Sequence, residues 1–211
     1  ISSIHKKNIY NKLKFTTRIS NELGLLFIME LIKFTSQSKL IKSAFIILLG
    51  SIALTISAKI KIPFYPVPMT MQTFVVMFLG LSFGYKIGLS AVGLYLLEGI
   101  AGLPVFSNSP ERGIGIVYFT GPTMGYLIGF LFACYLASFV KLKDNFLKIF
   151  AKLTLAVSTI YIFGILWLGI LIGWDKPILS LGVTPFLLAE LFKILLMCLL
   201  VKKISKLKNF I

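Results

Sequence analysis

Residues 59–72 have the sequence KIKIPFYPVPMTMQ, which lies between two apolar runs and contains Pro63, Pro66 and Pro68. Each proline removes a backbone hydrogen-bond donor and biases the preceding residue toward an extended conformation. A helix that forms in the first apolar run therefore cannot continue into the second. We predict a turn of defined shape between two helices.

The composition is typical of a membrane protein. Of the 211 residues, 57% are hydrophobic and 14% are charged, compared with about 25% charged in soluble domains, and the mean hydropathy is +0.94. A net charge of +15 would suggest nucleic-acid binding if the basic residues formed one polar folded face. Here the lysines lie between apolar runs, so we expect an integral membrane protein without a nucleic-acid partner.

Six apolar runs approach the roughly 20 residues that a helix needs to cross the hydrocarbon core. They lie at residues 40–58, 70–84, 87–103, 122–140, 149–173 and 183–201. The second run is short and directly follows the prolines, and interrupted segments of this kind occur at membrane depth where they pack on protein or line a cavity. The sequence predicts an all-α protein of six transmembrane helices in which the proline-rich stretch lines a cavity.

The distribution of Lys and Arg predicts that both termini are cytoplasmic. With this orientation most of the 22 Lys and Arg lie on the cytoplasmic side, and the outer loops contain Lys59, Lys61, Arg112 and Lys176. Residues 1–28 are rich in lysine and lack the apolar core and cleavage site of a signal peptide. We expect them to be a basic extension, with residues 29–211 as the membrane domain and Met29 as a candidate for the biological start.

Three ionisable residues lie inside the predicted helices, where a charge costs a few kcal/mol or more and is usually functional. Glu190 and Lys193 are three positions apart and so share one helix face. They form either a polar recognition point at a cavity or a self-neutralising pair. Glu98 lies close to the turn that contains Gly99 and Pro104, where solvation at the membrane edge is the alternative to a function.

Two stretches on the predicted outer side bracket the longest loop: GIAGLPVFSNS at 99–109 and GPTMGYLIG at 121–129. Asn108 is either a turn residue or a ligand contact, and Tyr126 is either an interfacial aromatic or part of a pocket. Gly125 and Gly129 have the spacing that lets membrane helices pack closely. The two cysteines, Cys134 and Cys198, lack metal-ligand spacing, and we interpret them as packing residues.

Three motifs in series resemble the BioY family, the biotin-binding membrane subunit of energy-coupling factor (ECF) transporters. They are PVPMTMQTF at 66–74, GLYLLEGIAGLPVF at 93–106 and GPTMGYLIGF at 121–130. The family's last motif, an acidic residue followed three positions later by lysine, is matched by Glu190 and Lys193, with Glu where Asp is usual. Glu98 departs from the family pattern, which has a small or apolar residue there. The resemblance covers about residues 40–200.

The resemblance implies an ECF S-component-like bundle of six helices in the bacterial cytoplasmic membrane, with a pocket for biotin near the outer surface. The implied ligand-binding residues are Asn108, Tyr126, Glu190 and Lys193. The implied pocket-shaping residues are Pro68, Gln72, Gly121, Pro122, Thr123 and Gly125. A carboxylate can accept the ureido N–H bonds of biotin, while amide and ammonium groups can donate. Which residue meets the ureido group and which meets the carboxylate stays open.

No reaction chemistry is visible in the sequence. The single histidine is His5, and no glycine-rich phosphate loop of the GxxxxGK[ST] kind occurs, so we expect neither an enzyme nor a cofactor. The resemblance implies a transmembrane coupling subunit and two ATPases as partners. Gly50, Ala53 and Ser57 are candidates for contact with the coupling subunit, and close packing within the chain is the alternative.

Three other functions deserve comparison. A binding subunit for a different vitamin is disfavoured by the three motifs. A membrane acyltransferase is disfavoured because no histidine lies within an apolar run. A purely structural membrane protein would have no need for the cost of burying Glu190 and Lys193.

Overall fold

A computed structural model of the chain describes residues 39–141 and 143–204. The chain divides into two units, residues 1–42 and 43–211. In the first unit only residues 39–42, the beginning of a helix, are described. The predicted extension at residues 1–28 and the candidate start at Met29 therefore lie outside the described residues.

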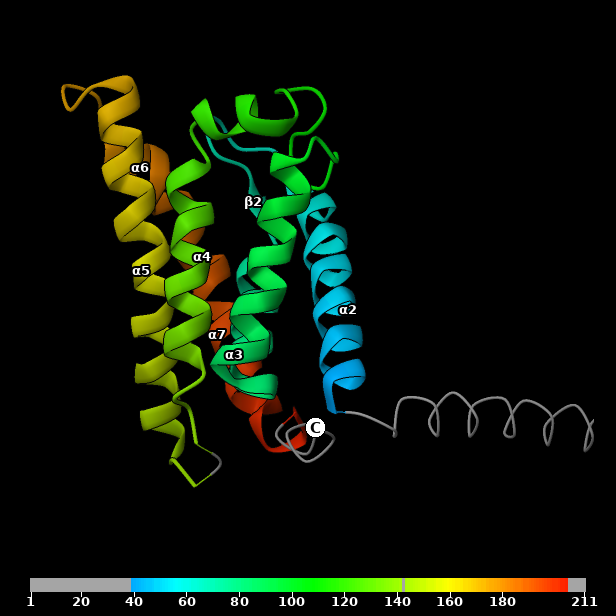
Figure 1. The fold of residues 1–211 in the computed structure, drawn as a ribbon. Coiled ribbons are helices and arrows are strands. Elements are labelled where there is room, and N and C mark those ends of the chain that lie inside the picture. Colours follow the sequence, from blue (N-terminus) through cyan, green and yellow to red (C-terminus); the bar gives the residue numbers. More distant parts are fainter. Residues whose placement is uncertain (1–38, 142, 205–211) are drawn as a thin grey trace, which may run out of the picture. The chain divides into compact units, whose positions relative to one another are not determined.

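The described part of the second unit is a helical bundle (Figure 1). Its long elements are α2 (Lys39–Lys59), α3 (Gln72–Ile100), α4 (Met124–Ala137), α5 (Phe146–Ile172) and α7 (Leu187–Ile204). The short elements are β1 (Lys61–Ile62), β2 (Met69–Thr70), the 3-10 helices η1 (Gly115–Thr120) and η2 (Thr184–Phe186), and α6 (Ile178–Gly182). Four helical segments are long and apolar enough to cross a membrane, and α4 is a shorter apolar helix. The predicted multi-pass α-helical membrane fold is confirmed.

The element α3 consists of two antiparallel helices joined at Gly84. This residue has φ 76° and ψ 176°, a backbone conformation that glycine adopts without steric cost. The side-chain amide of Gln72 donates to the Tyr95 hydroxyl at 2.6 Å, although 23 residues of continuous helix would separate them by about 34 Å. The two halves therefore correspond to the predicted helices at 70–84 and 87–103, which gives the bundle its six membrane helices.

The proline-rich stretch forms the predicted turn. β1 and β2 are antiparallel, with Lys61 opposite Thr70 and Ile62 opposite Met69, and the three prolines lie in the connection between them. The helix that follows begins only at Gln72 and runs to the bend at Gly84, about 18 Å by helix geometry. Because this is shorter than the roughly 30 Å hydrocarbon core, the hairpin completes the second membrane segment.

Glycines allow the helices of the bundle to approach each other closely. α4 packs against α3 and α5, and α7 packs against α3 and α5. A Cβ atom at Gly125 would lie 2.3 Å from the carbonyl oxygen of Phe163, and one at Gly129 would lie 2.5 Å from Cα of Ile160. The two glycines therefore serve the contact between α4 and α5, which is the packing alternative set out for them above.

Small residues of α2 pack against the chain's own helices. A Cβ atom at Gly50 would lie 2.8 Å from Cβ of Ala91, and Ser57 is buried with its hydroxyl donating to the carbonyl of Leu54. Ala53 is half-buried. Gly50 and Ser57 thus pack within this chain, which is the alternative set out above, and their contact with a coupling subunit stays a prediction.

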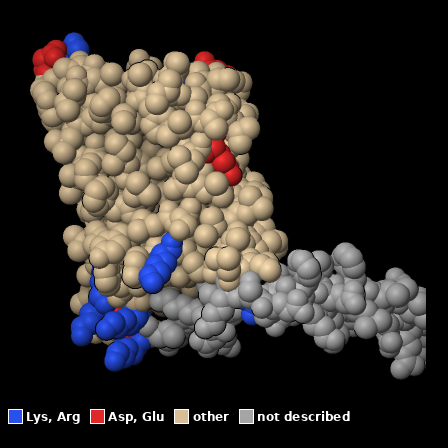
Figure 2. All heavy atoms as spheres, viewed as in Figure 1, with Lys and Arg blue, Asp and Glu red and all other residues tan. Residues whose placement is uncertain are grey.

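The buried apolar residues form two clusters along the bundle. One includes residues of the hairpin connection and of the segment 101–123, such as Val67 and Phe106, together with Tyr95 and Phe130 of the helices. The other joins the opposite parts of α3, α4, α5 and α7. Figure 2 shows most Lys and Arg of this face gathered at the end where α4 leads into α5, away from residues 101–123. We call the end with the hairpin and residues 101–123 the loop end.

Candidate ligand-binding site

A cavity lies inside the bundle at the loop end. The cavity and its mouth together hold about 550 Å³ of space free of protein atoms, a volume that includes open solvent at the mouth. Its apolar walls come from the hairpin, the loop after α3, and α4, α5 and η2: Val67, Met69, Phe106, Leu127, Phe130, Ile160 and Phe186. Its polar lining includes Thr70, Gln72, Thr73, Ser107, Thr123 and Glu190. The prediction that the proline-rich stretch lines a cavity is confirmed.

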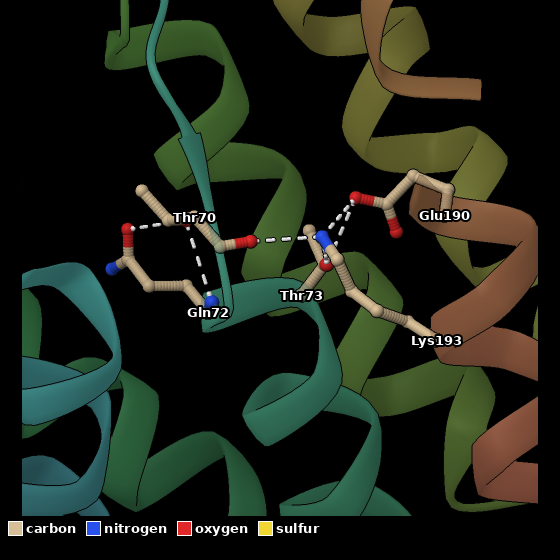
Figure 3. Close-up of polar contacts among 5 residues, drawn as sticks. All are labelled: Thr70, Gln72, Thr73, Glu190 and Lys193. Atoms are coloured by element: carbon tan, nitrogen blue, oxygen red, sulfur yellow. Dashed lines mark hydrogen bonds and ion pairs between the residues drawn. The ribbon is translucent and has the colours of Figure 1, made fainter. Parts of the chain in front are cut away.

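Glu190 and Lys193 form an ion pair at one wall of the cavity (Figure 3). The Lys193 ammonium donates to Glu190 Oε1 at 2.6 Å, to the Thr73 hydroxyl at 2.8 Å and to the Thr70 carbonyl at 2.8 Å. The Thr73 hydroxyl donates in turn to Glu190 Oε1 at 3.0 Å. Both charged side chains are buried. The pair therefore joins α7 to the start of α3 as well as neutralising itself.

Glu190 and Lys193 differ in how many of their hydrogen-bonding groups have partners inside the protein. An ammonium group has three donors, and all three of Lys193 have acceptors inside the protein. Glu190 Oε2, in contrast, is buried and accepts no hydrogen bond from the described residues, although the Tyr161 side chain lies close enough to the carboxylate to interact with it. A buried acceptor without a partner costs about 1–3 kcal/mol, and more when charged. Glu190 is thus the member of the pair that has an atom available to a ligand.

The neighbouring residue Gln72 is fixed by two hydrogen bonds. Its side-chain nitrogen donates to the Tyr95 hydroxyl at 2.6 Å, and its side-chain oxygen accepts from the Thr70 hydroxyl at 3.2 Å. Gln72 lines the cavity as predicted. These contacts link β2 to both halves of α3, so they hold the hairpin wall of the cavity in place.

Tyr126 lies in the cavity wall with its hydroxyl turned to the protein. The hydroxyl donates to the Gly182 carbonyl at 2.9 Å, which ties α4 to α6. The aromatic ring is therefore the part of Tyr126 that an apolar ligand can contact. The sequence prediction did not include α6, because this short helix lies between the apolar runs at 149–173 and 183–201 and lacks a helical repeat of its own. It did not distinguish η2 from the rest of the last run, in which this element lies.

Asn108 lies outside the cavity lining, whereas its neighbour Ser107 is part of it. The Asn108 side-chain oxygen accepts from Lys61 at 3.0 Å. Ser107 is buried, and its hydroxyl has no partner among the described residues. Sequence reasoning singled out the GIAGLPVFSNS stretch but not this serine, because polar residues of a turn cannot be told apart before the course of the loop is known.

The residues predicted to shape the pocket fall into two groups. Pro68, Gln72 and Thr123 line the cavity. Gly121, Pro122 and Gly125 are not in its lining: the Gly121 carbonyl accepts from the Trp167 indole at 2.8 Å, and Gly125 packs against α5. The GPTMGYLIGF motif therefore combines a ligand-facing side with one that joins α4 to α5.

Glu98 lies away from the cavity, whereas Tyr118 is part of its lining. Glu98 is half-buried, outside the cavity lining, and accepts a hydrogen bond from the Ser51 hydroxyl, so it links α2 to α3. Tyr118 on η1 lines the cavity, and its burial raises the pKa of its phenol above the ordinary value. Within residues 39–141 and 143–204, no group of three or more His, Cys, Asp or Glu is placed to hold a metal ion.

Comparisons with known proteins agree with this architecture. The sequence profile of the BioY family matches residues 29–210. The "Biotin transporter BioY" of Thermotoga maritima is 33% identical over 156 residues, which cover 74% of this chain and 90% of the relative. The "Probable biotin transporter BioY" of Rickettsia prowazekii is 30% identical over 187 residues, which cover 88% of this chain and 94% of the relative.

A solved structure has the same fold. It is described as the S-component for biotin from an ECF-type ABC transporter, a crystal structure at 2.1 Å, and it superposes with a TM-score of 0.68 at 25% sequence identity. The superposition covers 81% of this chain and 94% of that one. The family profile, the relatives and the bundle agree, and the chain belongs to the BioY family.

Proposed function

We propose that this protein binds biotin with high affinity and is the substrate-specific subunit of a biotin transporter in the bacterial cytoplasmic membrane. The observation that supports this function most directly is Glu190, which lines the cavity and whose buried Oε2 has no hydrogen-bond partner among the described residues. Relatives with similar sequences are named biotin transporters. Biotin is a ligand whose donors match this acceptor.

The chemistry of biotin fits the lining of the cavity. Its ureido group has two N–H donors, and a carboxylate oxygen such as Glu190 Oε2 can accept them. Its thioether ring is apolar and can pack against Phe106, Tyr126 and Phe186, which line the same cavity. Lys193 has no donor left for the ligand, so we assign it to the positioning of Glu190.

Uptake against a gradient would need energy from a partner. The sequence has no GxxxxGK[ST] phosphate loop, so we propose a transmembrane coupling subunit and two ATPases as partners. Ala53 stays a candidate for contact with the coupling subunit because it is only half-buried. We infer that the chain itself binds its ligand and catalyses no reaction.

Titration of the purified protein with biotin tests this function. We expect a dissociation constant in the nanomolar range, which corresponds to about −12 kcal/mol at one nanomolar. Riboflavin, a vitamin with a different pattern of donors, serves as the control and should not bind. An absence of binding at micromolar biotin would contradict the proposal, and tight binding of riboflavin instead would favour a different vitamin.

A further inference from the structure

Ser107 is a second unpartnered polar group in the cavity wall. It lies in the loop after α3, whereas Glu190 lies on α7, and it has 5% of its surface exposed. Its hydroxyl has no hydrogen-bond partner among the residues that the structure describes. Buried polar groups are nearly always paired. The residue therefore has an unused donor and acceptor at a position that a ligand in the cavity can reach.

The wall formed by Glu190 is unsuited to a negatively charged part of a ligand. The atom that it offers is a carboxylate oxygen, which accepts hydrogen bonds and repels a second carboxylate. The adjacent cation, Lys193, already donates to three protein acceptors. An acid group of the ligand must consequently lie at another part of the cavity.

The loop that contains Ser107 is held by two ammonium groups. Lys61 donates to the Ser107 carbonyl at 2.8 Å and to the Asn108 side chain at 3.0 Å. Lys59 donates to the carbonyls of Phe106 at 2.8 Å and Ser109 at 3.0 Å. Each of these bonding patterns uses two of the three ammonium donors.

The charge around this loop is positive on balance. Arg112 donates to the Pro66 carbonyl at 2.7 Å, so it joins the same loop to the hairpin. The acidic residue that influences Lys59 is Glu111. The three positive charges of Lys59, Lys61 and Arg112 outnumber the one negative charge of Glu111. This balance favours a ligand anion at the Ser107 wall over the Glu190 wall.

We propose that the Ser107 hydroxyl binds the carboxylate at the end of the ligand's chain, with Lys61 and Lys59 supplying the compensating positive charge. This inference rests on the proposed function, and it names the form of the ligand that the site selects. The ring of biotin then faces Glu190, and the chain runs toward the loop end. The free acid is bound in preference to neutral amides or esters of the same acid.

A comparison of biotin with its primary amide tests this assignment. The two molecules share the ring and the chain and differ only in the charged end, so the wild-type protein alone gives an answer. We expect biotin to bind at least about tenfold more tightly than the amide, the factor that each 1.4 kcal/mol of binding free energy represents.

Variants of Ser107 and Lys61 test whether these two residues cause the preference for the free acid. Ser107→Ala and Lys61→Met should each weaken the binding of biotin about tenfold or more while changing the binding of the amide about twofold or less. Ser82→Ala is the matched control, because Ser82 is also a buried serine without a partner among the described residues but lies outside the cavity. It should bind both molecules like the wild type.

The outcomes separate this inference from the function on which it rests. Equal affinity of the wild type for biotin and the amide overturns the inference and leaves biotin binding intact. Loss of affinity for both molecules by the same factor in Ser107→Ala and Lys61→Met also overturns it. If the folded wild type binds neither molecule, the proposed function fails, and the inference fails with it.

Discussion

Lys193 and Glu190 act as one unit in which each residue has a different role. Lys193 is saturated by Glu190, Thr73 and the Thr70 carbonyl, so it holds the carboxylate in one orientation. The second oxygen of Glu190, a residue that lines the cavity, is left without a hydrogen-bond partner among the described residues. An ion pair at this depth costs desolvation energy that its own attraction only partly recovers. Its retention is better explained by the orientation of a binding group than by stability.

The first prediction at this scale concerns Lys193→Ala. Removal of the ammonium leaves the Glu190 carboxylate buried without a cation and without the donor that orients it. We expect the affinity for biotin to fall at least about a hundredfold, or roughly 2.7 kcal/mol. Lys193→Arg should also bind poorly, because a planar guanidinium cannot reproduce the three contacts of the ammonium. Titration with biotin measures both effects.

Size-exclusion chromatography shows whether these variants remain folded. Lys176→Ala is the control, since Lys176 is exposed and forms an ion pair with exposed Asp175, and it should bind normally. If Lys193→Ala bound biotin like the wild type, the pair would be structural, and the ligand contacts would have to come from the loop end alone.

At the scale of the elements, the cavity is lined by helices that are too short to cross the hydrocarbon core by themselves. The first half of α3 begins after the proline hairpin and ends at Gly84, and α4 has 14 residues, about 21 Å by helix geometry. These short helices are held in place by close packing against their neighbours. The contact of α4 with α5 at Gly125 and Gly129 brings Tyr126 and Ile160 to the cavity from two different helices.

We predict that Gly125→Ala destabilises the bundle while Gly93→Ala does not. At Gly125 the new methyl group would lie 2.3 Å from the Phe163 carbonyl and 2.5 Å from Cβ of Trp167. Overpacking of this kind costs about 1–3 kcal/mol. At Gly93 no atom lies within 4 Å, so the gain in helix propensity, up to about 1 kcal/mol, should be retained.

Thermal unfolding of both variants in the same detergent provides the comparison. The midpoint of Gly125→Ala should fall below that of the wild type, and the midpoint of Gly93→Ala should equal or exceed it. Equal midpoints for the two variants would mean that α4 and α5 can separate without cost at Gly125.

At the scale of the whole molecule, the two ends of the described bundle differ in character. The loop end contains the cavity, the hairpin and the loop with the unpartnered Ser107. The opposite end contains Lys141 in the connection between α4 and α5 and Lys148 and Lys152 in the first turns of α5, and Figure 2 shows basic side chains gathered there. The positive-inside rule places such an end in the cytoplasm. The cavity would then open toward the outer side, from which a substrate arrives.

Labelling of single cysteines in intact cells tests this orientation. A membrane-impermeant maleimide should modify Glu111→Cys from outside and should modify Lys143→Cys only after the cells are permeabilised. Both positions are exposed, while the two natural cysteines are buried, so background labelling should be low. The reverse pattern would show that the cavity opens to the cytoplasm.

The sequence by itself determined the features that depend on order along the chain. Hydrophobic runs of sufficient length predict membrane helices because backbone groups in lipid must be satisfied within the segment. The prolines at 63, 66 and 68 required a break, and the structure has the hairpin there. The spacing of Glu190 and Lys193 predicted a shared helix face, and the structure has the ion pair.

Only the tertiary structure decided how these residues are used. Thr73 and Lys193 are 120 positions apart, and their contact leaves the lysine without a donor for a ligand. Gly50 was open to two interpretations until Ala91 was found against it, and Ser107 was one polar turn residue among several until its loop was placed over the cavity. Hydrogen-bond balance and burial depend on residues that are brought together from distant parts of the chain. Local spacing and hydropathy contain no information about those partners.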